Sequence, residues 1–140
     1  MTPPVRSIAV VPDVPALRPE FASIVDPVPE LRAAVAAAVA SADRVVRLNG
    51  SARRTHASPG PFDERAVAFD EHLLAALRGP DIEALHGVDR DLARELWADV
   101  EALGELAELL AGHQWTVQVE YDDAPYGVAW WVITYADAVR

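Results

Sequence analysis

The chain has 140 residues, of which 51% are apolar, so it is long enough to bury a core as one domain over 1–140 and is not typical of a disordered protein. Its net charge of −10 at pH 7 argues against nucleic acid and anionic membranes as partners, because both carry charge of the same sign. It contains no Cys, and its twelve Lys-or-Arg positions are all Arg, which excludes thiol catalysis, disulfides, cysteine-bound zinc and lysine chemistry.

The first half of the chain predicts a strand, a helix and a second strand. Residues 7–11 are a continuous apolar run that ends at Pro12, as in a strand buried on both faces. The Asp-Pro pair at 26–27 is typical of a helix start, and apolar residues then recur at helical spacing to about residue 42. Residues 45–48 predict the second strand. Because these elements follow one another directly, they predict a right-handed βαβ unit with parallel strands.

The middle of the chain predicts helices. Residues 62–78 place apolar side chains on one helical face, and the Gly-Pro pair after them ends that helix. Asp81 is typical of the cap of a short helical turn. A longer helical region follows from about residue 89 to Gly112, and Gly104 is a candidate bend or break within it.

The end of the chain predicts a β-hairpin. Residues 115–121 alternate between apolar and polar, which is typical of a half-buried strand, whereas residues 128–135 are apolar on both faces. The loop 122–127 joins them. Together these elements predict an α/β fold. We expect a compact three-layer domain whose small mixed sheet, with the βαβ unit first and the hairpin last, is flanked by helices.

The loops after the two parallel strands are the place where we expect a ligand. In α/β proteins such loops leave the sheet at one edge, which is the usual position of a binding site. Asp13 follows the first strand, whereas Ser51, Arg53 and Arg54 follow the second. We therefore expect these four residues to lie close together. The alternative for Asp13 is a simple ion pair with an arginine.

Residues 49–56 hold side chains that suit an anion. The Asn-Gly-Ser turn at 49–51 can present backbone N–H groups, and Arg53 and Arg54 add guanidinium groups that pair with a carboxylate or phosphate. His56 lies in the same loop and is a candidate general base. The alternatives are that the arginines tie this loop to the acidic helices and that His56 is structural.

The spacing of the histidines predicts no metal site. Patterns that place two His on one metal, such as His-x-x-x-His or His-x-His, are missing from the sequence. The adjacent aspartates at 122–123 suit either a cation or an ordinary turn. The many carboxylates of 63–108 fit the solvent-facing sides of helices.

Three segments of the chain carry a recognisable pattern. Residues 11–20 read V-P-D-V-P-A-L-R-P-E, residues 50–66 read G-S-A-R-R-T-H-A-S-P-G-P-F-D-E-R-A, and residues 123–128 read D-A-P-Y-G-V. They resemble the V-P-x-P-P-L-L-x-P-E, G-S-A-R-R-T…A-P-G-x-x-D-E-R-A and A-P-Y-G-V segments of actinobacterial proteins described as class III extradiol dioxygenase, subunit-B-like. The resemblance covers most of the chain in pieces and implies that family's fold.

The resemblance also implies what this chain lacks. The ring-cleaving relatives bind non-haem Fe(II) through two His and one carboxylate, and they use a further His as a base. Here Asp13 stands where the first ligand His is expected, and the central part of the longer relatives, which would carry the second, is missing. The base position corresponds to Arg53 or Arg54, with His56 nearby. The resemblance therefore implies a shortened member that has lost its metal ligands.

We expect a protein that binds a small anionic or phenolic molecule without a metal or other cofactor, and that can transform this molecule by acid–base chemistry. The predicted site residues are Asp13 and His56 for proton transfer and Ser51, Arg53, Arg54 and Tyr126 for binding. The alternatives are an Fe(II)-dependent ring-cleaving dioxygenase and a non-catalytic interaction subunit. The missing centre should leave apolar surface to be covered, which predicts a homodimer or larger homo-oligomer. With neither a signal peptide nor a membrane span predicted, we expect a cytoplasmic protein.

Overall fold

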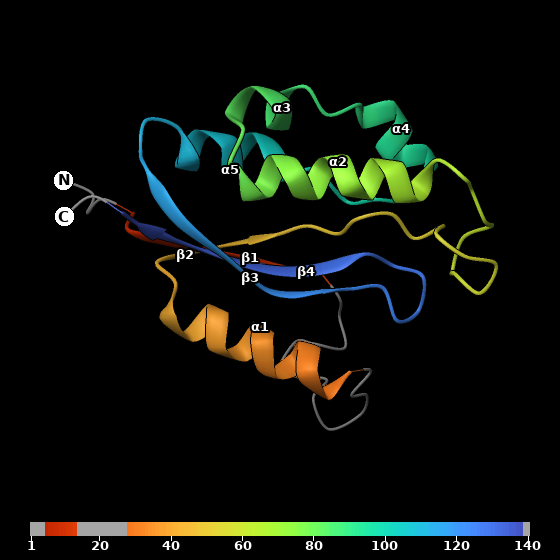
Figure 1. Cartoon of the computed structure of the whole chain (residues 1–140), viewed down its shortest axis with the longest axis horizontal. Helices are drawn as coiled ribbons and strands as arrows, with labels where there is room; N and C mark the ends of the chain where they lie inside the picture. Colours follow the sequence, from red (N-terminus) through yellow and green to blue (C-terminus); the bar gives the residue numbers. More distant parts are fainter. Residues whose placement is uncertain (1–4, 14–27, 139–140) are drawn as a thin grey trace.

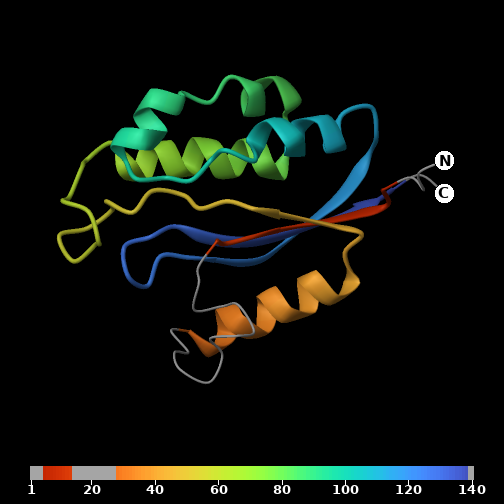
Figure 2. The same ribbon diagram turned by 180° about the vertical axis from the view of Figure 1, so that it is seen from behind.

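The structure is a computed structural model that describes residues 5–13 and 28–138. A four-stranded mixed sheet forms its middle layer, in the order β2-β1-β4-β3. The strands are β1 (Ser7–Val11), β2 (Arg44–Arg47), β3 (Trp115–Asp123) and β4 (Trp130–Asp137). Helix α1 (Pro29–Ser41) covers one face. The other face carries α2 (Ala66–Arg78), α3 (Ile82–His86), α4 (Arg90–Glu95) and α5 (Leu103–Leu110), as Figures 1 and 2 show. The predicted three-layer α/β fold is confirmed.

The βαβ unit and the hairpin lie where the sequence predicts them. Strands β1 and β2 pair in parallel, and β4 pairs antiparallel with both β1 and β3. Helix α1 has Pro29 in its first turn and Glu30 beside it, which suits the positive end of the helix dipole. The predicted cap at 26–27 lies outside the described residues. In the described part of the chain, none of the helices combines the length and the apolar character needed to cross a bilayer.

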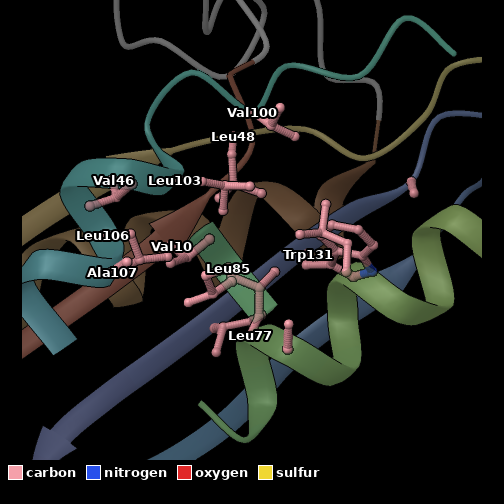
Figure 3. Packing of buried hydrophobic residues seen from close by; sticks show 14 of the residues in the cluster. Val10, Val46, Leu48, Leu77, Leu85, Val100, Leu103, Leu106, Ala107 and Trp131 are labelled. Carbon is pink, nitrogen blue, oxygen red and sulfur yellow. The ribbon is translucent and has the colours of Figure 1, made fainter. Parts of the chain in front are cut away.

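The sheet separates two apolar clusters. The larger one lies between the sheet and helices α2–α5, and it includes Val10, Val46 and Leu77, which are labelled among the packed side chains in Figure 3. The smaller one lies under α1 and includes Val11, Leu31 and Val132. Because β1 and β4 contribute side chains to both clusters, their sequences are apolar on both faces, as predicted.

A register shift between Val119 and Tyr121 lets β3 serve both faces of the sheet. Val117 and Val119 pack against the larger cluster, whereas Tyr121 packs against the smaller one. An extra residue in one strand reverses the inward and outward alternation beyond it. The half-buried pattern predicted for 115–121 is therefore confirmed up to the bulge.

The long helical region predicted from residue 89 to Gly112 is wrong, because it is two helices. Helix α4 ends at Glu95, and α5 begins at Leu103, so Gly104 lies inside a helix instead of bending one. The break is a tertiary effect. Asn49 and Asp99 exchange two backbone hydrogen bonds at 2.9 and 3.1 Å, which pulls the chain between the helices toward the loop after β2. The helix predicted from residue 62 likewise begins at Ala66.

Candidate functional site

The candidate site lies at the edge of the sheet where β1 and β2 end and β4 begins (Figure 1). Strand β1 stops before Pro12, and the chain beyond β2 then runs beside the residues that precede β4. The N–H of Gly50 donates to the carbonyl of Ala129 at 2.9 Å, and the N–H of Ala129 donates to the carbonyl of Ser51 at 2.9 Å. These bonds hold the arginine-containing loop against the sheet.

Asp70 on α2 organises this loop from inside the protein. Ser51 and Asp70 are the buried polar residues of the described chain, at 0% and 2% exposure. Ser51 donates its N–H to Oδ1 of Asp70 at 2.7 Å and its hydroxyl to Oδ2 at 2.6 Å, and Nη1 of Arg54 lies 3.5 Å from Oδ2. Burial raises the pKa of Asp70, against the hydrogen bonds from Ser51 and the charge of Arg54, which lower it. The hydroxyl of Ser51 therefore faces Asp70 and not solvent.

Asp70 is not among the predicted site residues, because the carboxylates of 63–108 fit the solvent-facing sides of helices. A signal was present. Asp70 lies four residues after Ala66 and three before Leu73, which is the spacing of the buried face of α2. A carboxylate at such a position, next to a loop with two arginines, is typical of a buried ion pair.

Gly50 permits the close approach on which this arrangement depends. A Cβ atom at position 50 would lie 2.6 Å from Cβ of Ala129, 2.8 Å from Cη2 of Trp131 and 2.9 Å from Oδ1 of Asp70. Backbone, indole and carboxylate therefore occupy the space that any larger residue needs. The Asn-Gly-Ser turn is thus required for packing.

Arg53 crosses the loop and bonds to backbone oxygens. Its Nε donates to the carbonyl of Pro61 at 2.5 Å, its Nη1 donates to the carbonyl of Glu95 at 2.6 Å, and Nη1 lies 3.7 Å from Oδ2 of Asp63. These contacts tie the loop to the end of α4 and to the turn before α2. They are the contacts of a residue that holds the loop in shape.

Arg54 is placed differently. Its backbone N–H donates to the carbonyl of Gly127 at 3.4 Å, which joins the loop to the β3–β4 turn. Its side chain is 26% exposed, and among the described residues its guanidinium group is paired with Asp70 alone. A guanidinium group has five N–H donors in a fixed plane, so donors are left for a ligand.

Asp13 lies at the same edge, beside Asn49. Its N–H donates to Oδ1 of Asn49 at 3.0 Å, and its carbonyl accepts from Nδ2 of Asn49 at 3.2 Å. The structure thus brings the loops after β1 and β2 together, as expected from their parallel pairing. That Asp13 and the two arginines share one pocket stays a prediction.

His56 and Tyr126 lie on the outer side of this region. His56 is exposed, and its ring packs on Phe62 with 4.6 Å between centroids. Tyr126 is 50% exposed and packs edge-on to Trp130 with 6.0 Å between centroids. Both side chains can therefore be reached from solvent.

Asp63, at the turn before α2, has a pKa well below the usual value of an aspartate. Arg65 donates Nε to Oδ1 of Asp63 at 3.0 Å and Nη2 to Oδ2 at 2.7 Å, and its backbone N–H donates to Oδ1 at 2.9 Å. The side-chain hydrogen bond from Arg65 lowers the pKa of Asp63 most, followed by its backbone hydrogen bond, and the charge of Arg53 adds to the effect.

This lowered pKa predicts a change of stability with pH. A lowered folded-state pKa contributes stability that is present above the unfolded value of about 4 and is lost as pH falls below it. We expect Asp63→Asn to flatten the decline of the urea midpoint between pH 5 and pH 3. Asp91→Asn is the matched control, because Asp91 is 87% exposed and pairs only with Arg94 among the described residues. Equal slopes in both variants would contradict this assignment.

The described residues do not assemble a metal site. Among residues 5–13 and 28–138, no three His, Asp or Glu side chains gather closely enough to hold a metal ion. They therefore do not supply the two-His, one-carboxylate set that a non-haem Fe(II) centre needs. The metal-free expectation stays a prediction.

Comparison with known proteins gives no family for the chain. No protein-family model matches it, and no similar sequence was found among curated proteins and no similar fold among solved structures. The extradiol-dioxygenase-like assignment therefore stays a prediction that depends on the three sequence segments.

Proposed function

We propose that this protein binds a small anionic or phenolic molecule at the edge of the sheet where β1 and β2 end. The observation that supports this best is the placement of Arg54. Its guanidinium group is oriented by a buried carboxylate, yet 26% of its side chain is exposed. Because Asp70 also accepts two hydrogen bonds from Ser51, its charge is shared among three donors, and Arg54 can still attract an anion.

The remaining predicted site residues have distinct parts in this proposal. Tyr126 lies on the rim, where its exposed ring can cover a planar ligand. Asp13 or His56 moves a proton if the bound molecule is transformed. Arg53 and Ser51 hold the loop in the conformation that orients Arg54. The proposal keeps the expectation of a metal-free, extradiol-dioxygenase-like protein.

Arg54→Gln tests the proposal. Gln keeps a donor for Asp70 but removes the charge and the fork of the guanidinium group. We expect benzoate to bind the wild-type protein and to bind the variant roughly 10–100-fold more weakly, the range that follows from losing one charge-assisted hydrogen bond. Binding is followed by tryptophan fluorescence and by NMR shift changes, with benzamide as the uncharged comparison ligand.

Arg44→Gln is the matched control. It removes the same charge from the other end of β2, where Arg44 is 51% exposed and pairs with Glu105 at 3.4 Å. This variant should bind benzoate as the wild type does, and circular dichroism reports whether each variant is folded. The proposal fails if the wild-type protein binds neither benzoate nor phenol at ligand concentrations up to about 10 mM. It also fails if both arginine variants lose the same affinity for benzoate.

We also propose that the protein is a cytoplasmic homodimer or larger homo-oligomer. The large apolar side chains that stay exposed in the described chain support the assembly. They are Val39, Phe62, Val67, Trp97 and Tyr126, at 36–54% exposure. Single exposed apolar residues are common, so their grouping on the surface decides which of them matter.

A further inference from the structure

Trp97 has an unusual backbone conformation for its residue type. It follows the end of α4, where its φ angle is 62°, and it has the one positive φ among the non-glycine residues of the described chain. The N–H of Ala98 donates to the carbonyl of Ala93 at 2.9 Å, and the N–H of Trp97 donates to the carbonyl of Arg94 at 3.2 Å. These two bonds define a Schellman motif, and its left-handed position is the one at which glycine is strongly preferred.

The surrounding bonds hold Trp97 in this strained conformation. The carbonyl of Leu96 accepts from the N–H of Ala52 at 3.0 Å, and the carbonyl of Glu95 accepts from Nη1 of Arg53 at 2.6 Å. The chain therefore turns outward at Trp97 because its neighbours are bound to the arginine-containing loop. A bulky residue in the left-handed region is uncommon and costs free energy, so its presence points to a use for the side chain.

The indole ring of Trp97 lies against the loop that carries two other exposed rings. A Cβ built on Gly60 would lie 3.1 Å from Cδ2 and Cε3 of Trp97, so the indole ring lies against Gly60. Phe62, two residues further along, is 44% exposed and packs on His56, and Trp97 itself is 54% exposed. We call His56, Phe62 and Trp97 the aromatic patch. Trp is among the residues most enriched at the energetic centres of protein interfaces.

The charges beside the aromatic patch are mixed and self-complementary. Nη1 of Arg65 lies 3.8 Å from Oε2 of Glu95, and these side chains are 50% and 60% exposed. Two copies related by a two-fold axis present the same patch to each other, so each Arg65 can meet the Glu95 of the other copy. In residues 50–66 and 94–99, which carry the patch, four Arg balance four Asp or Glu, so these segments have no net charge in a chain of net charge −10, which reduces repulsion between copies.

We propose that the aromatic patch is the contact surface of a homodimer, in which Trp97 and Phe62 of one copy pack against the same residues of a second copy. This inference rests on the proposed homo-oligomer and names its surface. The rings lie at the centre, where water is excluded, and Arg65 and Glu95 lie on the rim. The strained backbone at Trp97 is retained because it presents the indole ring to the second copy.

Sedimentation velocity and light scattering at about 100 μM and about 1 μM test this inference, because a protein–protein contact dissociates on dilution. We expect the wild-type protein to be dimeric at the higher concentration, and Trp97→Gly and Trp97→Ala to dimerise at least roughly tenfold more weakly. Phe62→Ala should weaken the dimer as well. Val39→Ser is the control, because Val39 is 36% exposed on α1, across the sheet from the aromatic patch, and it should leave the dimer unchanged.

Comparing the two Trp97 variants as monomers isolates the backbone strain. Both lack the indole ring, but only Gly removes the penalty of the left-handed conformation. We expect Trp97→Gly to melt roughly 2–8 °C above Trp97→Ala at 1 μM. A wild-type protein that is monomeric at both concentrations overturns the homo-oligomer and its surface together. A dimer that survives both Trp97 substitutions overturns the surface alone, and the benzoate measurement on Arg54 is independent of either result.

Discussion

Replacing Asp70 by Ala should lower the free energy of unfolding by about 3–5 kcal/mol, the range found when one partner of a buried ion pair is removed. The substitution leaves the N–H and hydroxyl of Ser51 without the acceptors that now lie at 2.7 and 2.6 Å, and it leaves Arg54 without its carboxylate. It also opens space beside Gly50, against which Asp70 packs. Urea unfolding followed by circular dichroism measures the change.

Three further variants separate the parts of this effect. Ser51→Ala removes one hydroxyl donor and should cost about 1–2 kcal/mol. Asp70→Asn keeps the shape of the side chain but turns an amide toward Arg54, so its cost should fall between those of the two alanine variants. Glu71→Ala is the control, since Glu71 is the exposed neighbour of Asp70 on α2 and should change stability by under about 0.5 kcal/mol. If Asp70→Ala were no more costly than Glu71→Ala, the buried network would contribute nothing.

The strands were predictable because their signal is local. Residues 8–11 are apolar without interruption, and β1 (Ser7–Val11) has the predicted bounds. Strand β2 begins one residue before the predicted start, and β3 continues two residues past the predicted end. A strand in a mixed sheet with helices on both faces must be apolar on one or both sides, so composition and alternation mark it in the sequence.

The break between α4 and α5 was not predictable from the same kind of signal. Leu92, Leu96, Val100 and Leu103 continue at helical spacing through it, and the structure buries or half-buries all four. The chain buries them without a continuous helix, because Asn49 binds Asp99 and Ala52 binds Leu96 across the loop. Those partners are more than forty residues away in the sequence, so helical periodicity carried no information about them.

The candidate site was likewise predictable from the sequence only in part. The sequence placed Asp13, Ser51, Arg53 and Arg54 near one sheet edge from the parallel pairing alone, and the structure brings the two loops together there. Which arginine is available to a ligand depends on contacts with Pro61, Glu95 and Asp70, which come from three other elements. The residue types therefore predicted that the loop suits an anion. Tertiary contacts decide which of its arginines holds the loop and which has donors left for a ligand.

Replacing Gly127 by Ala should destabilise the protein by about 2–5 kcal/mol, through two additive causes. Its φ angle of 77° lies in the left-handed region, which costs an L-residue about 1–2 kcal/mol. The added Cβ would also overlap Oγ of Ser58 and lie 2.8 and 2.9 Å from Cβ and Cα of Ser58, and such overpacking costs about 1–3 kcal/mol. The same turn accepts the N–H of Arg54 at the Gly127 carbonyl, so benzoate binding should weaken as well.

Two other glycines separate these causes. Gly112 has a φ angle of 80° but no atom within 4 Å of a built Cβ, so Gly112→Ala should show the conformational cost alone, about 1–2 kcal/mol. Gly104 lies in α5 with equally open space, so Gly104→Ala should stabilise the protein by up to about 1 kcal/mol. Thermal and urea unfolding should therefore show that Gly127→Ala loses more stability than Gly112→Ala. Gly112→Ala should lose only the cost of the left-handed backbone, and Gly104→Ala should gain stability. If Gly127→Ala cost no more than Gly112→Ala, the β3–β4 turn would not be closely packed against Ser58.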